Sequence, residues 1–347
     1  MNFFKSKEYY ERLEAKYISP LELNGRKIDI NWFSKIGSVR GLESIMQAEG
    51  FCGALPGLQR TFPTRAPRLV RYRRSKVKWY GITYFVDNFI TYGDIITSSS
   101  GIRVAVLMEP RHFKPEIYEA ADKNAEHLDV ILTHDEYILK KYPDKAVYCI
   151  AGAACIEDNS IGMNLSGKSK LVSTILSDKG FLEGHMFRHL FAREVISSRQ
   201  DPTELTALKK VDLYGTGIEG GSADYKSSTL KSYMFSVAIE NGISDTYFTE
   251  KIMDCFLTGT IPIYRGTKNI SDYFDPRGII GFETMDELKY ILENEVSKEK
   301  YKEMIPYAKN NLEITKKYMY IDDIMLLTTL EHLDNKGFDI SKLIRYY

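Results

Sequence analysis

Short apolar runs rich in β-branched residues alternate with helix-length segments through most of this chain, and this alternation constrains the fold more than any other feature. Strands that alternate with helices favour parallel sheets with crossover helices. Such sheets bind ligands at the carboxyl ends of their strands. The pattern therefore predicts an α/β fold. The runs expected to form strands are 103–108, 128–133, 147–150, 170–177, 211–214, 234–239 and 260–264.

The length of the chain predicts two domains. It has 347 residues, and single domains mostly hold about 100–200. A polar stretch rich in Gly, Ser and Asn at 157–168 resembles a linker or a long loop. We therefore expect an N-terminal domain at 1–160 and a C-terminal domain at 161–347. From Glu283 onward the apolar residues recur every three or four positions, which predicts a helical tail on the second domain.

Charge and hydropathy exclude several classes of protein. The chain has 47 Lys plus Arg and 47 Asp plus Glu, and this zero balance argues against a dedicated nucleic-acid binder. No apolar run approaches the roughly 18 residues that span a bilayer, and the N-terminus lacks the apolar core of a signal peptide. We expect no transmembrane segment and a cytoplasmic protein, at most peripheral at a membrane surface. The four cysteines lack paired ligand spacing and are expected to be reduced: Cys52, Cys149, Cys155 and Cys255.

Two local patterns allow more than one interpretation. The segment 65–78 holds seven basic residues in fourteen. A solvated edge strand or loop is favoured over a contact with a polyanion or an anionic membrane. Gly215 to Gly220 spell GxGxxG after a predicted strand, which in the right context binds a dinucleotide. Because a polar stretch follows in place of an amphipathic helix, a flexible glycine-rich loop is favoured over a nicotinamide site.

The most informative segment, 233–266, reads as strand, loop, helix and strand. Thr249 is expected to be the N-cap of the helix, and Gly259 its end. This order brings four polar residues to a strand end and a helix N-terminus: Glu240, Asn241, Glu250 and Lys251. Such a place suits sugar hydroxyls and phosphate. The alternative is that Glu250 only complements the helix dipole and Lys251 is a solvated charge.

This segment resembles the donor-binding signature of glycosyltransferase family 10, the α-1,3/4-fucosyltransferases. The positions that match are Tyr233, Phe235, Glu240, Asn241, Asp245, Tyr247, Thr249, Glu250, Lys251, Gly259, Thr260, Pro262 and Gly266. Upstream, Arg188 lies where the family has an arginine that binds the donor diphosphate. Glu109 lies where the family has its proposed catalytic base. The resemblance covers roughly residues 100–285, and Gly242 departs from it by replacing the usual serine.

The resemblance implies a fold of the GT-B type, with two Rossmann-like domains that face each other across a cleft. The acceptor would bind the first domain and the nucleotide sugar the second. The implied reaction is an inverting, metal-independent transfer of fucose from GDP-fucose to a hydroxyl of a glycan. No Asp-x-Asp metal motif occurs in the chain. We expect no cofactor other than the donor substrate.

The resemblance also assigns roles to single residues. Glu109 would remove the proton of the acceptor hydroxyl. Arg188 and Lys251 would bind the diphosphate and stabilise it as the leaving group. The remaining donor contacts, to phosphate, ribose or sugar hydroxyls, would come from Glu240, Asn241, Tyr247 and Glu250.

Several alternatives stay open at this level. The same fold could use another nucleotide sugar. Less favoured are an NAD-type oxidoreductase, through the glycine run, and a carbohydrate-binding protein without activity. Glu109 could instead cap its own loop through Arg111 or His112. Asp135 is expected to cap the helix at 135–141, with His134 in the cleft between the domains.

Overall fold

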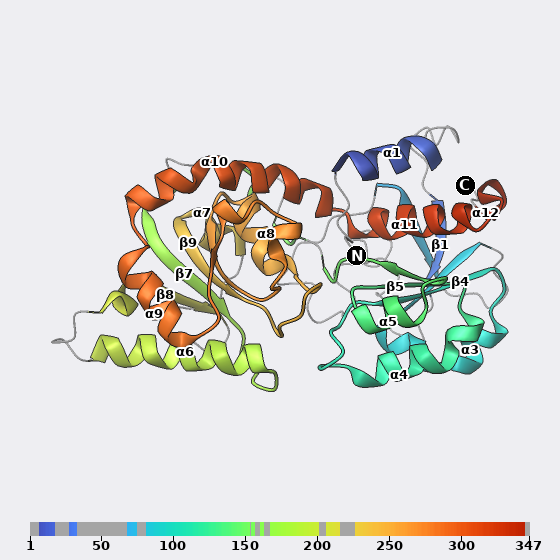
Figure 1. The fold of residues 1–347 in the computed structure, drawn as a ribbon, viewed down its shortest axis with the longest axis horizontal. Coiled ribbons are helices and arrows are strands. Elements are labelled where there is room, and N and C mark those ends of the chain that lie inside the picture. The colour runs from blue at the N-terminus through green and yellow to red at the C-terminus, as the bar shows by residue number, and fades with distance from the viewer. Residues whose placement is uncertain are drawn as a thin grey trace. The chain divides into compact units, whose positions relative to one another are not determined.

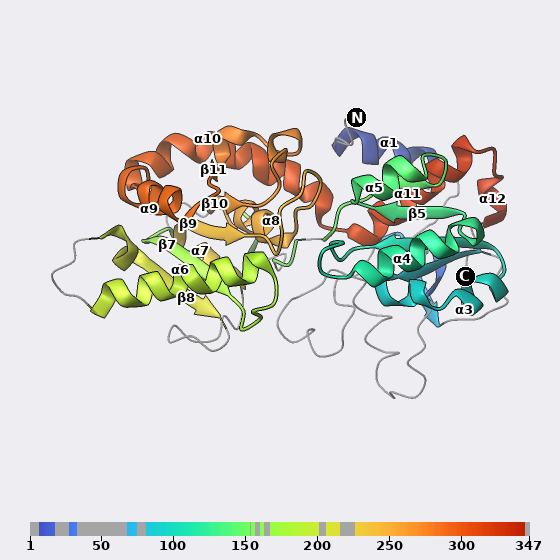
Figure 2. The same ribbon diagram turned by 60° about the horizontal axis from the view of Figure 1, so that its bottom comes forward.

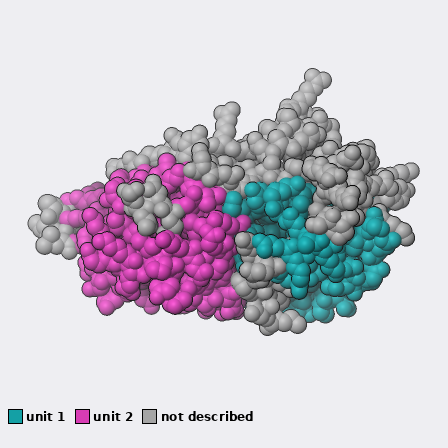
Figure 3. Space-filling model, turned by 90° about the horizontal axis from the view of Figure 1, so that it is seen from above, with its two compact units in different colours: residues 1–59, 64–153, 317–347 teal, residues 60–63, 154–316 magenta. Residues whose placement is uncertain are grey.

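The computed structural model describes residues 7–17, 28–32, 68–74, 81–152, 154–156, 160–162, 167–200, 206–215 and 226–343. The chain divides into two compact units, shown in Figure 3. Unit 1 comprises residues 1–59, 64–153 and 317–347, and unit 2 comprises residues 60–63 and 154–316. Each unit is built around a parallel sheet with helices, as the alternation of strands and helices predicts (Figure 1).

The sheet of unit 1 has the strand order β2-β1-β3-β4-β5-β6, and all its pairings are parallel. The strands are β1 (Ile28–Trp32), β2 (Val70–Arg74), β3 (Ile82–Val86), β4 (Ile102–Leu107), β5 (Val130–Thr133) and β6 (Ala146–Tyr148). Strands β4 to β6 confirm the predicted runs, whereas β1 to β3 were not predicted. Strand β2 lies at the edge of the sheet, which confirms the edge-strand interpretation for part of the basic segment 65–78.

Helices cover both faces of this sheet. They are α1 (Lys7–Tyr17), α3 (Gly93–Ser98), α4 (Pro115–Asn124), α5 (Glu136–Lys141), α11 (Ile321–Asn335) and α12 (Ile340–Leu343). On one face, Phe85 of β3 packs in a core with Ile117 of α4. On the other face, the neighbouring Tyr84 makes a 3.3 Å hydroxyl contact with Thr329 of α11. Successive residues of a strand point to opposite faces, so α4 and α11 lie on opposite sides of the sheet (Figure 1).

The division into units differs from the expected domains 1–160 and 161–347, because the segment 317–347 belongs to unit 1. Asp323 of α11 is buried and accepts hydrogen bonds from the backbone N–H of Leu69 and from Nε of Arg68, both at 2.9 Å. The helical pattern of the tail was predicted correctly. The unit to which residues 317–347 belong was not predicted, because periodicity carries no information about contacts between residues far apart in the chain.

The sheet of unit 2 has the order β11-β10-β9-β7-β8 and is also parallel. Its strands are β7 (Lys170–Leu176), β8 (Val211–Gly215), β9 (Tyr233–Ile239), β10 (Ile261–Arg265) and β11 (Ile280–Gly281). The first four confirm predicted runs. Strand β7 is followed in the chain by β8 on one side of it, and then by β9 on the other. The order of strands therefore reverses between β7 and β9, and ligands bind open α/β sheets at such a point.

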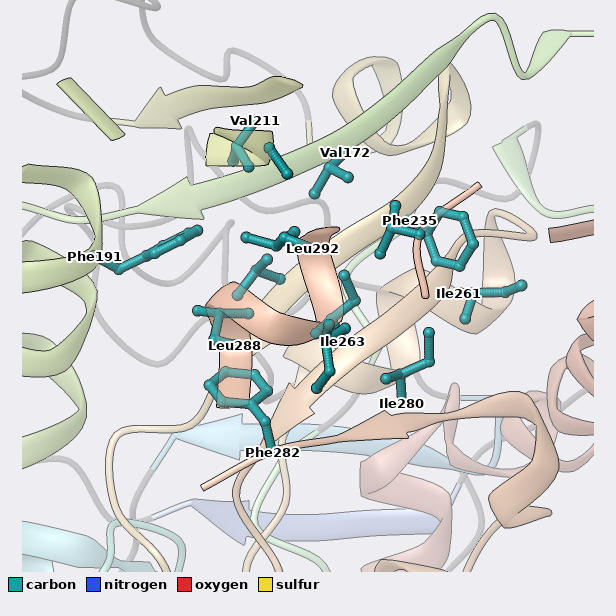
Figure 4. Packing of buried hydrophobic residues seen from close by; sticks show 14 of the residues in the cluster. Val172, Phe191, Val211, Phe235, Ile261, Ile263, Ile280, Phe282, Leu288 and Leu292 are labelled. Atoms are coloured by element: carbon teal, nitrogen blue, oxygen red, sulfur yellow. The ribbon is translucent and has the colours of Figure 1, made fainter. Parts of the chain in front are cut away.

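The described helices of unit 2 are α6 (Glu183–Gln200), α7 (Lys226–Lys231), α8 (Glu250–Leu257), α9 (Met285–Asn294) and α10 (Lys298–Thr315). The core of the unit packs the sheet against α6, α9 and α10. Figure 4 shows Phe191 of α6 and Leu288 of α9 packed with Val172 and Ile263 of the sheet. Tyr301 of α10 belongs to the same core. Helices α6 and α10 each have 18 residues and extend along the unit (Figure 2).

Three of the cysteines confirm the expectation from the sequence. Cys149, Cys155 and Cys255 are free and buried, whereas Cys52 lies outside the described residues. Among the described helices, none is both long and apolar enough to cross a membrane.

Replacing Asp323 by alanine tests the attachment of α11 to unit 1. The change leaves the buried N–H of Leu69 without its acceptor, and an unsatisfied buried donor costs about 1–3 kcal/mol. We expect the free energy of unfolding, measured in urea, to fall by that amount. Glu303→Ala in the helix at Lys298–Thr315 is the control, because its ion pair with Lys300 is exposed and should contribute little. Equal effects of the two variants would contradict this account.

Candidate functional site

The candidate site lies at the carboxyl ends of β7 and β9, where the strand order of unit 2 reverses. The chain leaves β7 for helix α6, and it leaves β9 at Glu240 for helix α8. Gly184 brings α6 against the end of β9, because its N–H donates to the carbonyl of Asn241 at 3.2 Å. A Cβ on Gly184 would lie 1.9 Å from the carbonyl oxygen of Glu240. Only glycine allows the helix and the strand end to approach this closely.

Glu240 holds together the loop between β9 and α8. Its side chain has 0% exposure. Its carboxylate accepts from the N–H of Thr249 at 2.8 Å and from the hydroxyl of Thr249 at 2.7 Å. The same carboxylate pairs with Lys251 at 3.2 Å. A buried carboxylate requires such partners, so Glu240 determines where α8 begins. Whether it also contacts a donor stays a prediction.

The expected capping role of Thr249 was wrong in its chemistry, although its position was right. Thr249 is the N-cap residue of α8, but its side chain makes no capping hydrogen bond to the helix. Its hydroxyl instead donates to Glu240 and accepts from Nζ of Lys251 at 2.9 Å. A capping hydroxyl must accept from a backbone N–H, and here the hydroxyl of Thr249 accepts instead from the ammonium group of Lys251, a charged and stronger donor.

Two glycines of the sequence signature have clear structural reasons. A Cβ on Gly266 would lie 2.6 Å from Cγ of Glu240 and 2.4 Å from the hydroxyl of Tyr264. Gly266 therefore makes room for the buried carboxylate. Gly259 has φ of 68° just after the end of α8, a left-handed conformation that favours glycine. This confirms the predicted end of that helix.

Arg188 of α6 is a buried cation at the same place, with 7% exposure. Its Nε donates to the carbonyl of Gly184 at 3.0 Å, and its Nη2 donates to Oδ1 of Asn241. These two partners are uncharged. Burial lowers the pKa of Arg188, and the more distant charges of Glu240 and Glu250 only partly oppose this effect. The protein thus places a guanidinium out of water without a direct ion pair among its described contacts.

Lys251 and Glu250 begin α8, and neither fits the alternative interpretation. Lys251 is 19% exposed and lies 3.2 Å from Glu240 and 3.5 Å from Glu250, so it is not a solvated charge. Burial alone would raise the pKa of Glu250, but the charges of Lys226 and Lys251 outweigh it and hold that pKa below its ordinary value. Glu250 is therefore ionised and ion-paired rather than a simple helix-dipole acid.

Tyr247 completes the group of predicted donor residues in unit 2. It is 3% exposed, and its carbonyl accepts from the hydroxyl of Thr267. Its side chain interacts electrostatically with Arg188. The structure thus brings Arg188, Glu240, Asn241, Tyr247, Glu250 and Lys251 together around the ends of β7 and β9 and the start of α8.

Two charged residues of this site were not predicted. Lys226 begins α7, and its Nζ lies 3.2 Å from Glu250 and 3.3 Å from Asp254. Burial raises the pKa of Asp254 to about 6, although Lys226 opposes the shift. Asp254 lies one turn after Glu250 on α8, so helical spacing could have identified it. Lys226 comes from another element, and no local pattern indicates it.

Glu109 belongs to unit 1, two residues beyond the end of β4. Its turn is held by hydrogen bonds from two sides: the carboxylate of the partly buried Asp87 accepts from the N–H groups of Met108 at 2.8 Å and of Glu109 at 3.2 Å. The hydroxyl of Tyr118 donates to the carbonyl of Glu109 at 2.7 Å. Asp87 has φ of 45°, a strained conformation for a residue other than glycine. The backbone that carries the Glu109 side chain is therefore rigidly placed.

Two smaller expectations concern the neighbours of Glu109. Arg111 binds Asp135 through two hydrogen bonds of 2.9 and 2.6 Å, and whether Arg111 or His112 also caps the loop with Glu109 stays a prediction. Asp135 caps α5 as predicted, accepting from the N–H of Ile138 at 2.9 Å. His134 is 3% exposed, and burial lowers its pKa to about 4. A neutral, buried imidazole fits a structural role.

The other candidate patterns add no site. Gly215 is the last residue of β8, and Gly217 and Gly220 lie outside the described residues. Within the described ranges, no group of three or more His, Cys, Asp or Glu side chains is arranged to hold a metal ion.

Gly184→Ala tests the close approach of α6 to β9. Alanine is about 1 kcal/mol better than glycine in a helix interior, yet here its Cβ would collide with backbone. Overpacking of this kind costs about 1–3 kcal/mol, so we expect a lower melting temperature. Gly180→Ala is the control, because a Cβ there has nothing within 4 Å. A Gly184→Ala variant as stable as Gly180→Ala would show that the two elements can separate freely.

Comparisons with known proteins agree with this geometry. Residues 191–325 match the model of "Glycosyltransferase family 10 (fucosyltransferase) C-term". An α-(1,3)-fucosyltransferase of Helicobacter pylori is 31% identical over 105 residues, which is 29% of this chain and 22% of that protein. The match thus spans less than a quarter of that relative.

A crystal structure of an α1,3-fucosyltransferase has the same fold, with a TM-score of 0.51 and 15% identity over 86% of this chain and 91% of that one. The crystal structure of an α1,3-fucosyltransferase with GDP gives a TM-score of 0.50, again with 15% identity and the same coverage. The expected α/β fold of the GT-B type is confirmed. Residues 191–325 are therefore similar in sequence to the C-terminal domain of glycosyltransferase family 10, and the chain has the fold of the related α1,3-fucosyltransferase structure.

Proposed function

We propose that this protein is an inverting, metal-independent glycosyltransferase that transfers fucose from GDP-fucose to a hydroxyl of a glycan acceptor. The observation that carries the proposal is Arg188, a buried guanidinium without a direct ion pair among its described contacts, beside the start of α8. A buried cation in this state favours binding of an anion. The fucosyltransferase relatives, and the GDP in one related structure, support a nucleoside diphosphate as that anion.

Three positive groups suit a diphosphate in this place. Arg188 offers a planar fork for two phosphate oxygens. Lys251 adds an ammonium group 2.9 Å from the hydroxyl of Thr249. The N-terminus of α8 contributes its helix dipole. Together they would stabilise the charge that develops on the leaving diphosphate, which is the role a divalent cation has in metal-dependent transferases.

The hydroxyls of the donor would be bound by the remaining groups. An ionised carboxylate only accepts hydrogen bonds, so Glu250 suits a sugar or ribose hydroxyl. Tyr247 and Asn241 lie beside Arg188 and would orient the phosphate or the sugar. Because the side chain of Glu240 has no exposed surface, we propose that its contribution is to hold Thr249 and Lys251.

In unit 1 we propose Glu109 as the general base on the acceptor side. It would take the proton of the acceptor hydroxyl while that oxygen attacks the anomeric carbon, so that the bond to the diphosphate breaks and the configuration inverts. The positions of Asp87 and Tyr118 around its backbone support this role, because a base must be held within hydrogen-bond reach of its proton.

A nucleotide panel tests the donor. We expect GDP and GDP-fucose, but not UDP or NAD, to raise the melting temperature. A ligand at one hundred times its Kd adds about 2.7 kcal/mol to stability. Arg188→Ala should remove most of the GDP effect. Stabilisation by a UDP sugar would refute the fucose assignment, stabilisation by NAD would favour an oxidoreductase, and no response to any nucleotide would refute the proposal.

Glu109→Gln tests the base. The amide keeps the size of the side chain but cannot accept the proton, so we expect turnover to fall by about 10²–10⁴-fold. GDP affinity, measured by calorimetry, should not change. Glu116→Gln, an exposed carboxylate of α4, is the matched control and should keep full turnover. If Glu109→Gln turned over donor at the normal rate with saturating acceptor, another group would have to be the base.

A further inference from the structure

We propose that Lys226 is a positioning residue for the donor: it fixes the carboxylate of Glu250 so that this group can bind donor hydroxyls, and it leaves Lys251 available to the diphosphate. The inference rests on the proposed function and extends it to a residue that the family signature in this sequence does not include. Lys226 is only 11% exposed, so it acts through its neighbours.

The geometry places Lys226 between two carboxylates of α8. Its Nζ lies 3.2 Å from Oε1 of Glu250 and 3.3 Å from Oδ2 of Asp254. The two acids are one helical turn apart, and the side chain of Asp254 is 1% exposed. Two such carboxylates repel each other, and burial removes part of their hydration. A cation that lies between them offsets both costs. Lys226 supplies that cation from a separate helix, α7.

Asp254 is itself held in place by backbone. Its Oδ1 accepts from the N–H of Cys155 at 2.6 Å, while Oδ2 receives Lys226. The ammonium group is therefore held on one side by a fixed acceptor, and on the other side it orients Glu250. This arrangement differs from a flexible surface ion pair, because both ends of the contact are restricted.

The cations that hold Glu250 leave part of its carboxylate accessible. Lys226 and Lys251 both approach Oε1, at 3.2 and 3.5 Å. The side chain of Glu250 is 25% exposed. An ionised carboxylate with one oxygen held by cations presents the other as an acceptor for hydroxyl groups. Lys226 thereby selects the orientation in which Glu250 can bind them.

The surrounding charges explain why Lys251 alone is not enough. Among the described residues, the charged groups that act on Glu250 are Lys226 of α7, Lys251 and Asp254 of α8 and Arg188 of α6, and Glu240 after β9 shares Lys251 with it. Lys251 is already shared between Glu240 and Glu250. Without Lys226, the charge of Glu250 would draw Lys251 further toward it and away from a bound diphosphate.

The experiment is a double-mutant cycle on GDP and donor binding. Lys226→Met keeps much of the side-chain volume but removes the charge. We expect the affinity for GDP to fall and the KM for the donor to rise, each by about tenfold or more, because hydrogen bonds to charged groups are among the stronger ones. In a Glu250→Gln background the same substitution should have little further effect, since the two residues act as a unit. Lys226→Arg should restore most of the affinity. The exposed Lys302 of α10 supplies the control Lys302→Met, which should bind GDP normally.

The pH dependence separates positioning from a merely structural role. In the wild type, the cations keep the pKa of Glu250 low, so its carboxylate stays ionised as the pH falls. Without Lys226 the pKa of Glu250 rises, so the loss of GDP affinity at acidic pH should begin at a higher pH. In Lys226→Arg the pH at which this loss begins should return toward that of the wild type. If Lys226→Met does not fold, Lys226→Gln takes its place in the cycle.

The outcomes are distinguishable from a failure of the proposed function. A wild type that binds no nucleotide refutes the function. A wild type that binds GDP, together with a Lys226→Met variant of equal affinity and equal pH profile, overturns only the role of Lys226. Equal losses in the wild-type and Glu250→Gln backgrounds would also overturn it, because Lys226 would then act independently of Glu250.

Discussion

The buried carboxylate of Glu240 is the interaction on which the rest of the site depends. It lies at the end of β9 with no exposed surface, and it is satisfied by Thr249 and Lys251 at the start of α8. A charge this deep is tolerated only if its partners are held firmly. The two glycines around it, Gly184 and Gly266, are where α6 and the end of β10 come close enough to enclose it. One acid thus joins two strand ends and two helices.

The charges around this acid are nearly balanced, which determines what the site can bind. Lys226 and Lys251 are engaged by Glu240, Glu250 and Asp254. Arg188 has only uncharged direct partners among its described contacts. An incoming anion would therefore meet one guanidinium that needs a counter-charge and a helix N-terminus that favours it. The zero net charge of the whole chain conceals this local arrangement.

Unit 1 shows the same principle with different partners. The partly buried Asp87 accepts from the backbone N–H groups of Met108 and Glu109, and Tyr118 donates to the carbonyl of Glu109. The buried Asp323 accepts from the backbone N–H of Leu69 and attaches the last long helix to this unit. In each case a carboxylate with little access to water is satisfied by backbone N–H groups, so it fixes a turn or a helix rather than a flexible side chain.

Much of this protein could be predicted from local sequence. Strands β4 to β10, the end of α8 at Gly259 and the cap of α5 at Asp135 follow from apolar runs, turn residues and capping preferences. The signature around Glu240 to Lys251 identified the residues that the structure groups at the end of β9. These features depend on neighbours a few residues apart, so the order of residues is sufficient to determine them.

Other features were decided only by the tertiary structure. Local patterns did not indicate that Lys226 lies between Glu250 and Asp254, that Asp87 holds the turn of Glu109, or that 317–347 belongs to unit 1. Each involves groups far apart in the chain. The sequence by itself determined which segments are strands and helices and which residues carry the donor signature. The packing of the sheets decided how those residues are paired, because a buried charge takes whichever partner the fold brings within reach.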